Sequence, residues 1–277
     1  MTNKWISIVI LGFIYYLHGY SQELQKGPSK ENQVISIHKD HQLYQFGHAD
    51  AFVNGLYKGI LPVNELESQG DFGLGAPDMV NGELTINEGK AYQTTADGST
   101  FQTADTMKIP FAMVTFFRSD TSVVLSKVAS LDDLYAQLSQ QLKNKNAMYA
   151  IRIKGAFETI KTRAFPQVKE DGMIPLAQML DKQQFFDYQR TKGSLIGFWM
   201  PSYLAGINIT GFHFHFLSSD TKYGGHLLQA VSSQKVVVEI SKLEDFLLQV
   251  PDDATYQHYP FVGENNTGLK KVEKGSE

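Results

Sequence analysis

Three histidines stand close together in the stretch Gly211-Phe-His-Phe-His-Phe-Leu-Ser-Ser-Asp-Thr-Lys-Tyr-Gly-Gly-His-Leu227. Alternate residues of a β-strand point to the same face, so His213 and His215 face one way and the phenylalanines between them face the other. The Ser-Ser-Asp and Gly-Gly residues that follow are typical of a turn. If the reversal is centred near Asp220, His226 lies about opposite His215, where Cβ atoms of paired residues are ~5 Å apart. The stretch therefore predicts a β-hairpin with three imidazoles on one face.

Three converging imidazoles form a metal site with coordination positions left open. This arrangement suits a catalytic Zn²⁺ better than a closed structural site, in which the protein supplies all four ligands. A His-x-His pair can also be the polar face of an amphipathic strand, and the third histidine favours the metal site over that interpretation. The other histidines show no such grouping: His18, His38, His41, His48 and His258.

The composition indicates a globular protein with a sizeable core. The chain has 277 residues, of which 42% are apolar and 18 are phenylalanine. This length suits one large domain or two small ones that share an interface. A net charge of −4 and the lack of any run of basic residues give no electrostatic case for a nucleic-acid partner.

The first 21 residues have the pattern of a secretory signal peptide. Lys4 is followed by an apolar stretch of 13 residues, 5–17, and then by Gly19-Tyr-Ser21 as small residues before a cleavage point near Ser21. The stretch is shorter than the ~20 residues that a membrane-spanning helix needs. We therefore expect a secreted or periplasmic protein with no membrane association after signal cleavage. The chain has no cysteine, so it carries neither a disulfide framework nor a lipid-attachment thiol.

The remaining chain predicts an α+β fold with two β-rich subdomains, mixed sheets and a few helices, in which the metal site lies on a hairpin of the C-terminal part. Strands outnumber helices without regular alternation, which argues against a doubly wound sheet. We expect a polar leader at 22–42, an N-terminal subdomain at 43–170 and a C-terminal subdomain at 171–277 that carries the histidines and a tail. The clearest helix is 130–145, where Ser130 can cap the first turn. Other helices are expected at 50–57, 62–69 and 175–182. Strands are expected at 84–86, 91–94, 111–117, 148–153, 156–163, 195–199, 212–217, 225–231 and 235–240.

Other polar motifs carry little information when taken alone. The glycine-rich segment 70–75 lacks the Lys-Ser/Thr of a phosphate-binding loop and does not link a strand to a helix. A tight loop is the better interpretation. Glu83 follows a turn, Arg163 ends a strand and Glu273 lies in a polar tail, so each reads by itself as a solvated charge.

Several motifs in order make the chain resemble the α-acetolactate decarboxylase family from Leu43 to Glu273. The matching pieces are Gly70-Asp-Phe-Gly-Leu-Gly75, Asn81-Gly-Glu-Leu84, Pro110-Phe-Ala-Met-Val-Thr-Phe-Phe117, Tyr149-Ala-Ile-Arg-Ile-Lys-Gly155, Thr162-Arg163, Gly197-Phe-Trp199 and the histidine hairpin.

The resemblance implies that His213, His215 and His226 hold Zn²⁺ or another divalent metal. It also implies that Glu83, Arg163 and Glu273 are the catalytic residues and that no organic cofactor is used. The tail assignment rests on a short Lys-Lys-Val-Glu pattern, so Glu264 and Glu277 remain alternatives to Glu273.

The expected function is metal-dependent decarboxylation of 2-acetolactate, a 2-hydroxy-3-oxo acid, to acetoin and CO₂. Zinc would act as a Lewis acid that stabilises an enediolate. Arg163 would bind the substrate carboxylate, and a glutamate, Glu273 or Glu83, would donate the proton. A homodimer is expected from the resemblance alone. The alternatives are a secreted zinc hydrolase that uses metal-activated water and a non-catalytic metal- or carbohydrate-binding protein.

Overall fold

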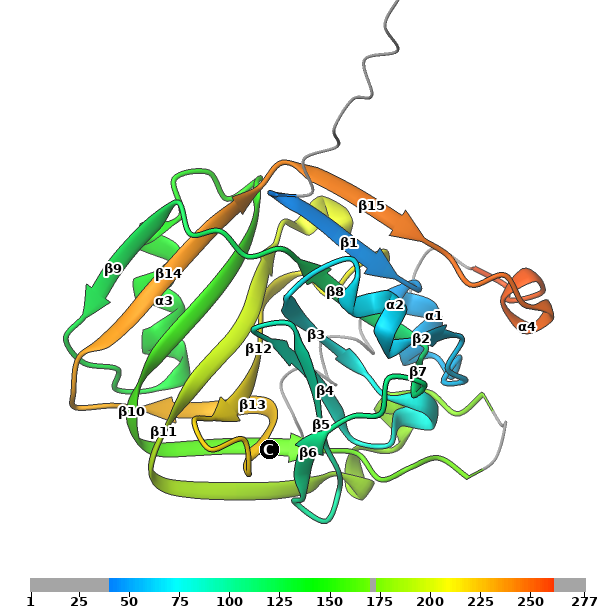
Figure 1. Cartoon of the computed structure of the whole chain (residues 1–277), viewed down its shortest axis with the longest axis horizontal. Coiled ribbons are helices and arrows are strands. Elements are labelled where there is room, and N and C mark those ends of the chain that lie inside the picture. Colours follow the sequence, from blue (N-terminus) through cyan, green and yellow to red (C-terminus); the bar gives the residue numbers. More distant parts are fainter. Residues whose placement is uncertain (1–39, 170–172, 262–277) are drawn as a thin grey trace, which may run out of the picture. The chain divides into compact units, whose positions relative to one another are not determined.

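The computed structural model describes residues 40–169 and 173–261, most of which belong to two sheets (Figure 1). The larger sheet has seven strands in the order β15-β1-β8-β3-β4-β5-β6. It is mixed, because β1 and β15 are parallel whereas its other neighbours are antiparallel. Its strands are β1 (Gln42–Phe46), β3 (Phe72–Ala76), β4 (Glu83–Asn87), β5 (Lys90–Thr94), β6 (Thr100–Gln102), β8 (Phe111–Thr115) and β15 (Asp245–Gln249).

The second sheet has six strands and closes on itself in part. Its order is β11-β12-β13-β10-β14-β9, and β10 also pairs with β11, so that the strands from β10 to β13 form a ring. Figure 1 shows the two longest strands, β10 and β11, curving together around this part of the molecule. The strands are β9 (Thr121–Leu125), β10 (Met148–Ala164), β11 (Gln184–Met200), β12 (Gly211–Ser218), β13 (Gly224–Val231) and β14 (Val236–Leu243), and a separate two-stranded ladder joins β2 (Leu61–Pro62) to β7 (Lys108–Ile109).

The helices of the described residues are short, apart from α3. They are α1 (Ala49–Val53), α2 (Val63–Glu67), α3 (Leu131–Gln141), α4 (Ala254–Gln257) and four 3₁₀ turns, η1 (Asp78–Val80), η2 (Leu176–Gln178), η3 (Leu180–Lys182) and η4 (Ser202–Leu204). The predicted start of α3 is confirmed, because the backbone N–H of Asp133 donates to Oγ of Ser130 over 3.1 Å. Leu134 and Leu138 are buried in the core of the six-stranded sheet. None of the described helices is long and apolar enough to span a membrane.

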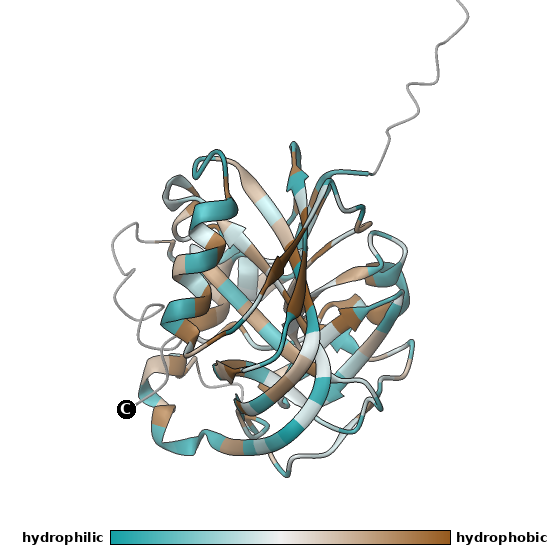
Figure 2. Ribbon diagram, turned by 90° about the vertical axis from the view of Figure 1, so that its left-hand side faces the viewer, coloured by the Kyte–Doolittle hydropathy of each residue, from teal (hydrophilic) through white to brown (hydrophobic). Residues whose placement is uncertain are grey.

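Apolar side chains fill the space inside and between the sheets. In Figure 2 the strands through the middle of the view are largely brown, whereas outer turns and helices are largely teal. One cluster lies within the six-stranded sheet and includes Ile151, Phe157 and Leu195. Another joins the two sheets, since Leu74 of β3 packs in one cluster with Phe198 of β11. The two sheets therefore pack together through this shared cluster.

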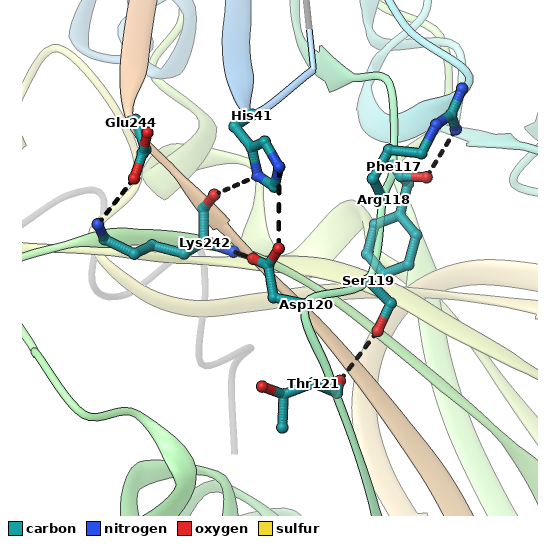
Figure 3. Close-up of polar contacts among 8 residues, drawn as sticks. All are labelled: His41, Phe117, Arg118, Ser119, Asp120, Thr121, Lys242 and Glu244. Atoms are coloured by element: carbon teal, nitrogen blue, oxygen red, sulfur yellow. Dashed lines mark hydrogen bonds and ion pairs between the residues drawn. The ribbon is translucent and has the colours of Figure 1, made fainter.

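Polar contacts join the two places where the chain passes from one sheet to the other (Figure 3). The chain leaves the seven-stranded sheet after β8 and returns to it after β14. The backbone N–H of Lys242 donates to Oδ2 of Asp120 over 2.7 Å, and Nδ1 of His41 donates to the carbonyl oxygen of Lys242 over 2.9 Å. These bonds hold β1, the start of β9 and the end of β14 side by side.

The predicted α+β class with β-rich parts and a few helices is confirmed. The predicted division at residue 170 does not coincide with the division between the sheets, because β15 returns to the first sheet and β10 belongs to the second. The Pro- and Gly-containing segment near residue 170 is instead the connection from β10 to β11. The predicted strands 148–153 and 156–163 are a single strand, since Gly155 continues the ladder opposite Gly193. The predicted helix at 175–182 consists of two 3₁₀ turns. The predicted signal peptide and all but the last three residues of the predicted leader lie outside the described residues.

Candidate active site

The hairpin predicted from the histidines is formed by β12 and β13. His215 pairs directly with His226, as the position of the turn predicts. Phe214 and Phe216 are buried in the core of the six-stranded sheet. Because side chains alternate along a strand, burial of these rings turns His213 and His215 to the other face, toward β4 of the seven-stranded sheet.

The three imidazoles converge closely enough to share one ion. Nε2 of His213 lies 3.2 Å from Nδ1 of His226, and the ring centroids are 4.9 to 5.5 Å apart. One ring nitrogen from each histidine lies within 4.8 Å of the other two. All three side chains are buried. Three neutral imidazole nitrogens with room for further ligands are the donor set of a catalytic divalent metal site.

The surroundings of these rings favour the neutral form that binds a metal. Burial, assisted by the Arg163 charge, lowers the pKa of His213 to about 3. Burial also lowers the pKa of His215 well below its usual value, and the charges of His213 and Arg163 act in the same direction. Nδ1 of His215 lies 2.8 Å from the carbonyl oxygen of Leu84, to which it donates. This bond fixes the tautomer and leaves Nε2 with its lone pair available.

A buried ion pair lies next to the histidines. Nη1 of Arg163 donates to Oε1 of Glu83 over 2.6 Å, and the two residues are 3% and 7% exposed. Oε2 of Glu83 lies 3.4 Å from Nε2 of His215. Arg163 stands directly opposite His226 in the β10–β13 ladder, and its guanidinium lies 4.9 Å from the centre of the Phe165 ring. The pair therefore brings one fixed positive charge and one carboxylate to the three imidazoles.

A tight turn brings Glu83 into this position. Gly82, which precedes it, has φ +92° in the left-handed region. A Cβ atom at this residue would lie 2.0 Å from the carbonyl oxygen of Thr94, the residue that pairs with Glu83 in β5. Glycine is therefore required for the approach of this turn to β5.

The five polar side chains line one part of a partly open pocket. The other side chains that line the pocket are apolar and belong to a single core cluster. They are Phe52, Val53, Ala76, Val80, Phe111, Phe165, Leu176 and Ile209. A pocket with one polar and one apolar side suits a small molecule that carries charged oxygens at one end and alkyl groups at the other.

The structure brings together five of the six predicted site residues, and the sixth, Glu273, lies outside the described residues together with Glu264 and Glu277. Local sequence predicts that Glu83 and Arg163 are solvated charges. Only the family resemblance identified them as site residues. The apolar wall was not predicted. Its residues come from separate segments with no common period, so no local pattern could have found them.

The fold and the pocket define an α+β enzyme for a small molecule, with a candidate metal centre between two sheets. The chain belongs to the alpha-acetolactate decarboxylase family, whose model matches residues 43–262.

Relatives of this family cover most of the chain. The alpha-acetolactate decarboxylase of Methanosarcina mazei is 34% identical over 248 residues, which are 89% of this chain and 85% of the relative. That of Methylococcus capsulatus is 34% identical over 215 residues, 78% of this chain and 82% of the relative. The crystal structure of alpha-acetolactate decarboxylase from Bacillus subtilis strain 168 has a TM-score of 0.80 at 27% identity and covers 85% of this chain and all of that chain.

Proposed function

We propose that this chain converts 2-acetolactate to acetoin and CO₂ with the help of a divalent metal. Membership of the alpha-acetolactate decarboxylase family supports the reaction. The single observation that carries the proposal is the convergence of three buried histidines and the Glu83–Arg163 pair in one pocket.

The main requirement of the reaction is stabilisation of the negative charge that develops on the substrate when CO₂ leaves. Breaking the bond between carbon 2 and the carboxylate releases CO₂ and leaves an electron pair, which moves onto the ketone oxygen as an enediolate. A proton delivered to carbon 2 then gives acetoin. A divalent ion held by His213, His215 and His226 would supply Lewis-acid stabilisation of negative charge on substrate oxygens. The lowered pKa values of His213 and His215, and the bond that orients the His215 ring, fit such an ion.

Arg163 and Glu83 take the other two tasks in this proposal. A guanidinium has five N–H donors, so Arg163 can hold Glu83 through one nitrogen and still present other donors to a substrate carboxylate. Glu83 lies against both Arg163 and His215, so its carboxyl group is positioned to donate or accept a proton beside the bound substrate. Glu273 is proposed as the second glutamate of the site.

The test is acetoin formation from racemic 2-acetolactate by zinc-loaded protein, chelator-stripped protein and zinc-loaded His215→Ala protein. We expect turnover only in the first sample and recovery of the second when zinc is restored. Consumption of 2-acetolactate at no more than its spontaneous rate in all three samples would contradict the proposal. Tight zinc binding without acetoin would show that the scaffold serves another substrate.

We also propose that the protein is exported, because residues 1–21 have the charge, apolar stretch and small residues of a signal peptide. Expression of the full chain, followed by N-terminal sequencing of the protein from the medium or periplasm, should give a mature end near Gln22. An intact Met1 in a cytoplasmic fraction would contradict export.

A further inference from the structure

A strained backbone segment precedes Glu83. Met79 and Val80 both adopt left-handed backbone conformations, with φ 51° and 54°. Such angles are uncommon for any residue with a Cβ atom, and they are most unfavourable for a β-branched residue such as valine. Two adjacent cases, four and three residues before Glu83, indicate strain that the surrounding structure must maintain.

Hydrogen bonds from three other parts of the chain hold this segment in place. The backbone N–H of Met79 donates to the carbonyl oxygen of Tyr57, and that of Val168 donates to the carbonyl oxygen of Met79, each over 2.8 Å. On either side, the backbone N–H of Gly59 donates to Oδ1 of Asp78, and Nε2 of Gln93 donates to the carbonyl oxygen of Asn81, each over 2.6 Å. Local bonds add to these, since the backbone N–H of Gly82 donates to the carbonyl oxygen of Val80 over 2.7 Å, so long-range and local hydrogen bonds together hold the conformation.

This conformation places the side chain of Val80 in the lining of the pocket. Val80 is 2% exposed and lines the same pocket as the histidines, whereas Met79 lines a neighbouring pocket. Other wall residues such as Ala76 and Phe111 belong to regular strands and need no strain to reach their positions. Val80 is the apolar lining residue that precedes Glu83 on the same short segment, and both residues line the pocket.

We propose that Val80 limits the size of the alkyl group on carbon 2 of the substrate. This inference rests on the proposed function, in which Arg163 binds the carboxylate of a 2-hydroxy-3-oxo acid. Carbon 2 carries that carboxylate, the hydroxyl group, the acetyl group and the alkyl group. When the carboxylate, hydroxyl and ketone oxygens bind the polar residues of the pocket, tetrahedral geometry directs the alkyl group away from them, toward the apolar lining that includes Val80.

The experiment compares 2-hydroxy-3-oxobutanoates that carry a methyl, ethyl or propyl group on carbon 2. The measured quantity is kcat/KM for each, expressed relative to the methyl compound. We expect Val80→Ala to raise the relative value for the propyl compound about tenfold or more, since one methylene in an apolar pocket changes discrimination by about 10- to 200-fold. Val80→Ile should lower the relative value for the ethyl compound.

Two further variants separate the effect of side-chain size at residue 80 from a general effect on folding. Glycine adopts φ 54° without strain, so Val80→Gly should fold and should favour the propyl compound still more than Val80→Ala. Val128→Ala removes the same atoms from a fully buried valine in the core cluster of the six-stranded sheet and should leave the ratios unchanged.

Three results would overturn the inference. The first is a set of Val80→Ala and Val80→Gly ratios equal to those of the unmodified protein. The second is an equal change of ratio in Val128→Ala. The third comes from one additional substrate, 2-hydroxy-2-methyl-3-oxopentanoate, which is lengthened at the ketone end. A change of relative kcat/KM in the Val80 variants for this compound alone would place Val80 at the ketone end. If the unmodified protein does not turn over the methyl compound, the proposed function fails, and the inference falls with it.

Discussion

The two sides of the pocket are built in different ways. The polar side comes from paired strands: His213 and His215 lie on β12, His226 on β13 and Arg163 on β10, and Glu83 begins β4. The apolar side comes mainly from short helices and connections. It includes Phe52 of α1, Leu176 of η2 and Ile209, which lies between η4 and β12.

This difference follows from the kinds of contact that each side must make. Hydrogen bonds and metal ligation depend on direction, so the polar groups need a backbone that a ladder of hydrogen bonds keeps in register. Apolar contact depends on area and shape and has no preferred direction, so irregular segments can provide it. The exception is Val80, whose strained backbone is held in position by hydrogen bonds to its segment. Substitutions of the polar groups should therefore be far more costly than substitutions at sites where direction does not matter.

Loss of one histidine should have the largest effect on activity. His215→Ala removes a ligand whose ring is fixed by the Leu84 carbonyl group. We expect loss of bound zinc and a fall in kcat of about a thousandfold or more, because a metal ion supplies several kcal/mol of charge stabilisation. Zinc content and acetoin formation are measured together. The control is His258→Ala, at an exposed residue outside the pocket. Retention of both metal and activity by His215→Ala would show that the polar side is not a metal site.

Loss of Arg163 should have the largest effect on stability. Arg163→Met leaves the carboxylate of Glu83 buried without its ion-pair partner, which should cost about 3–5 kcal/mol in the free energy of unfolding. Arg152→Met breaks the pair with Glu239, whose side chains are 16% and 23% exposed, and Lys154 remains 3.8 Å from that carboxylate. A cost of about 0–1 kcal/mol is expected there. Urea unfolding measures both, and equal costs would contradict the distinction.

The turn before Glu83 should be sensitive to one added methyl group. Gly82 and Gly89 both have positive φ, +92° and +75°, so alanine at either position should cost about 1–2 kcal/mol from backbone strain. Gly82→Ala should cost clearly more and should reduce turnover, because its Cβ atom meets the Thr94 carbonyl group, whereas nothing lies within 4 Å at Gly89. Thermal unfolding and acetoin formation are measured for both variants. Equal stability and activity would show that the turn can move without moving Glu83.

The smallest effect is expected far from the pocket. Ser130→Ala removes the side-chain acceptor of the Asp133 N–H at the start of α3 and should lower the free energy of unfolding by about 1 kcal/mol. Activity at a temperature well below the transition should stay unchanged. A loss of activity larger than the loss of folded protein would reveal coupling between α3 and the pocket.

Features with a short-range cause could be predicted from sequence. The hairpin followed from the alternation of Phe and His and from the turn near Asp220, and its register was confirmed. Helix α3 followed from a cap and an apolar stripe, although it ends at Gln141, earlier than the predicted 145.

Features that depend on distant partners could not be predicted in this way. Strand β15 was not expected, because it lies parallel to β1, and Gln42 pairs with Asp245 from the other end of the chain. Gly155 looked like the end of a strand, yet its pairing with Gly193 carries β10 onward.

Neighbouring residues specify the alternation of Phe and His faces in the hairpin, its turn, the cap of α3 and the spacing of the three histidines. Each of these features depends only on residues that are close along the chain. Tertiary structure alone decided that Glu83 and Arg163, 80 residues apart, become a buried pair beside those histidines. It also decided that Val80 adopts a left-handed conformation and enters the pocket wall. A buried charge or a strained backbone is unfavourable unless distant groups compensate it, and those groups meet only when the two sheets come together.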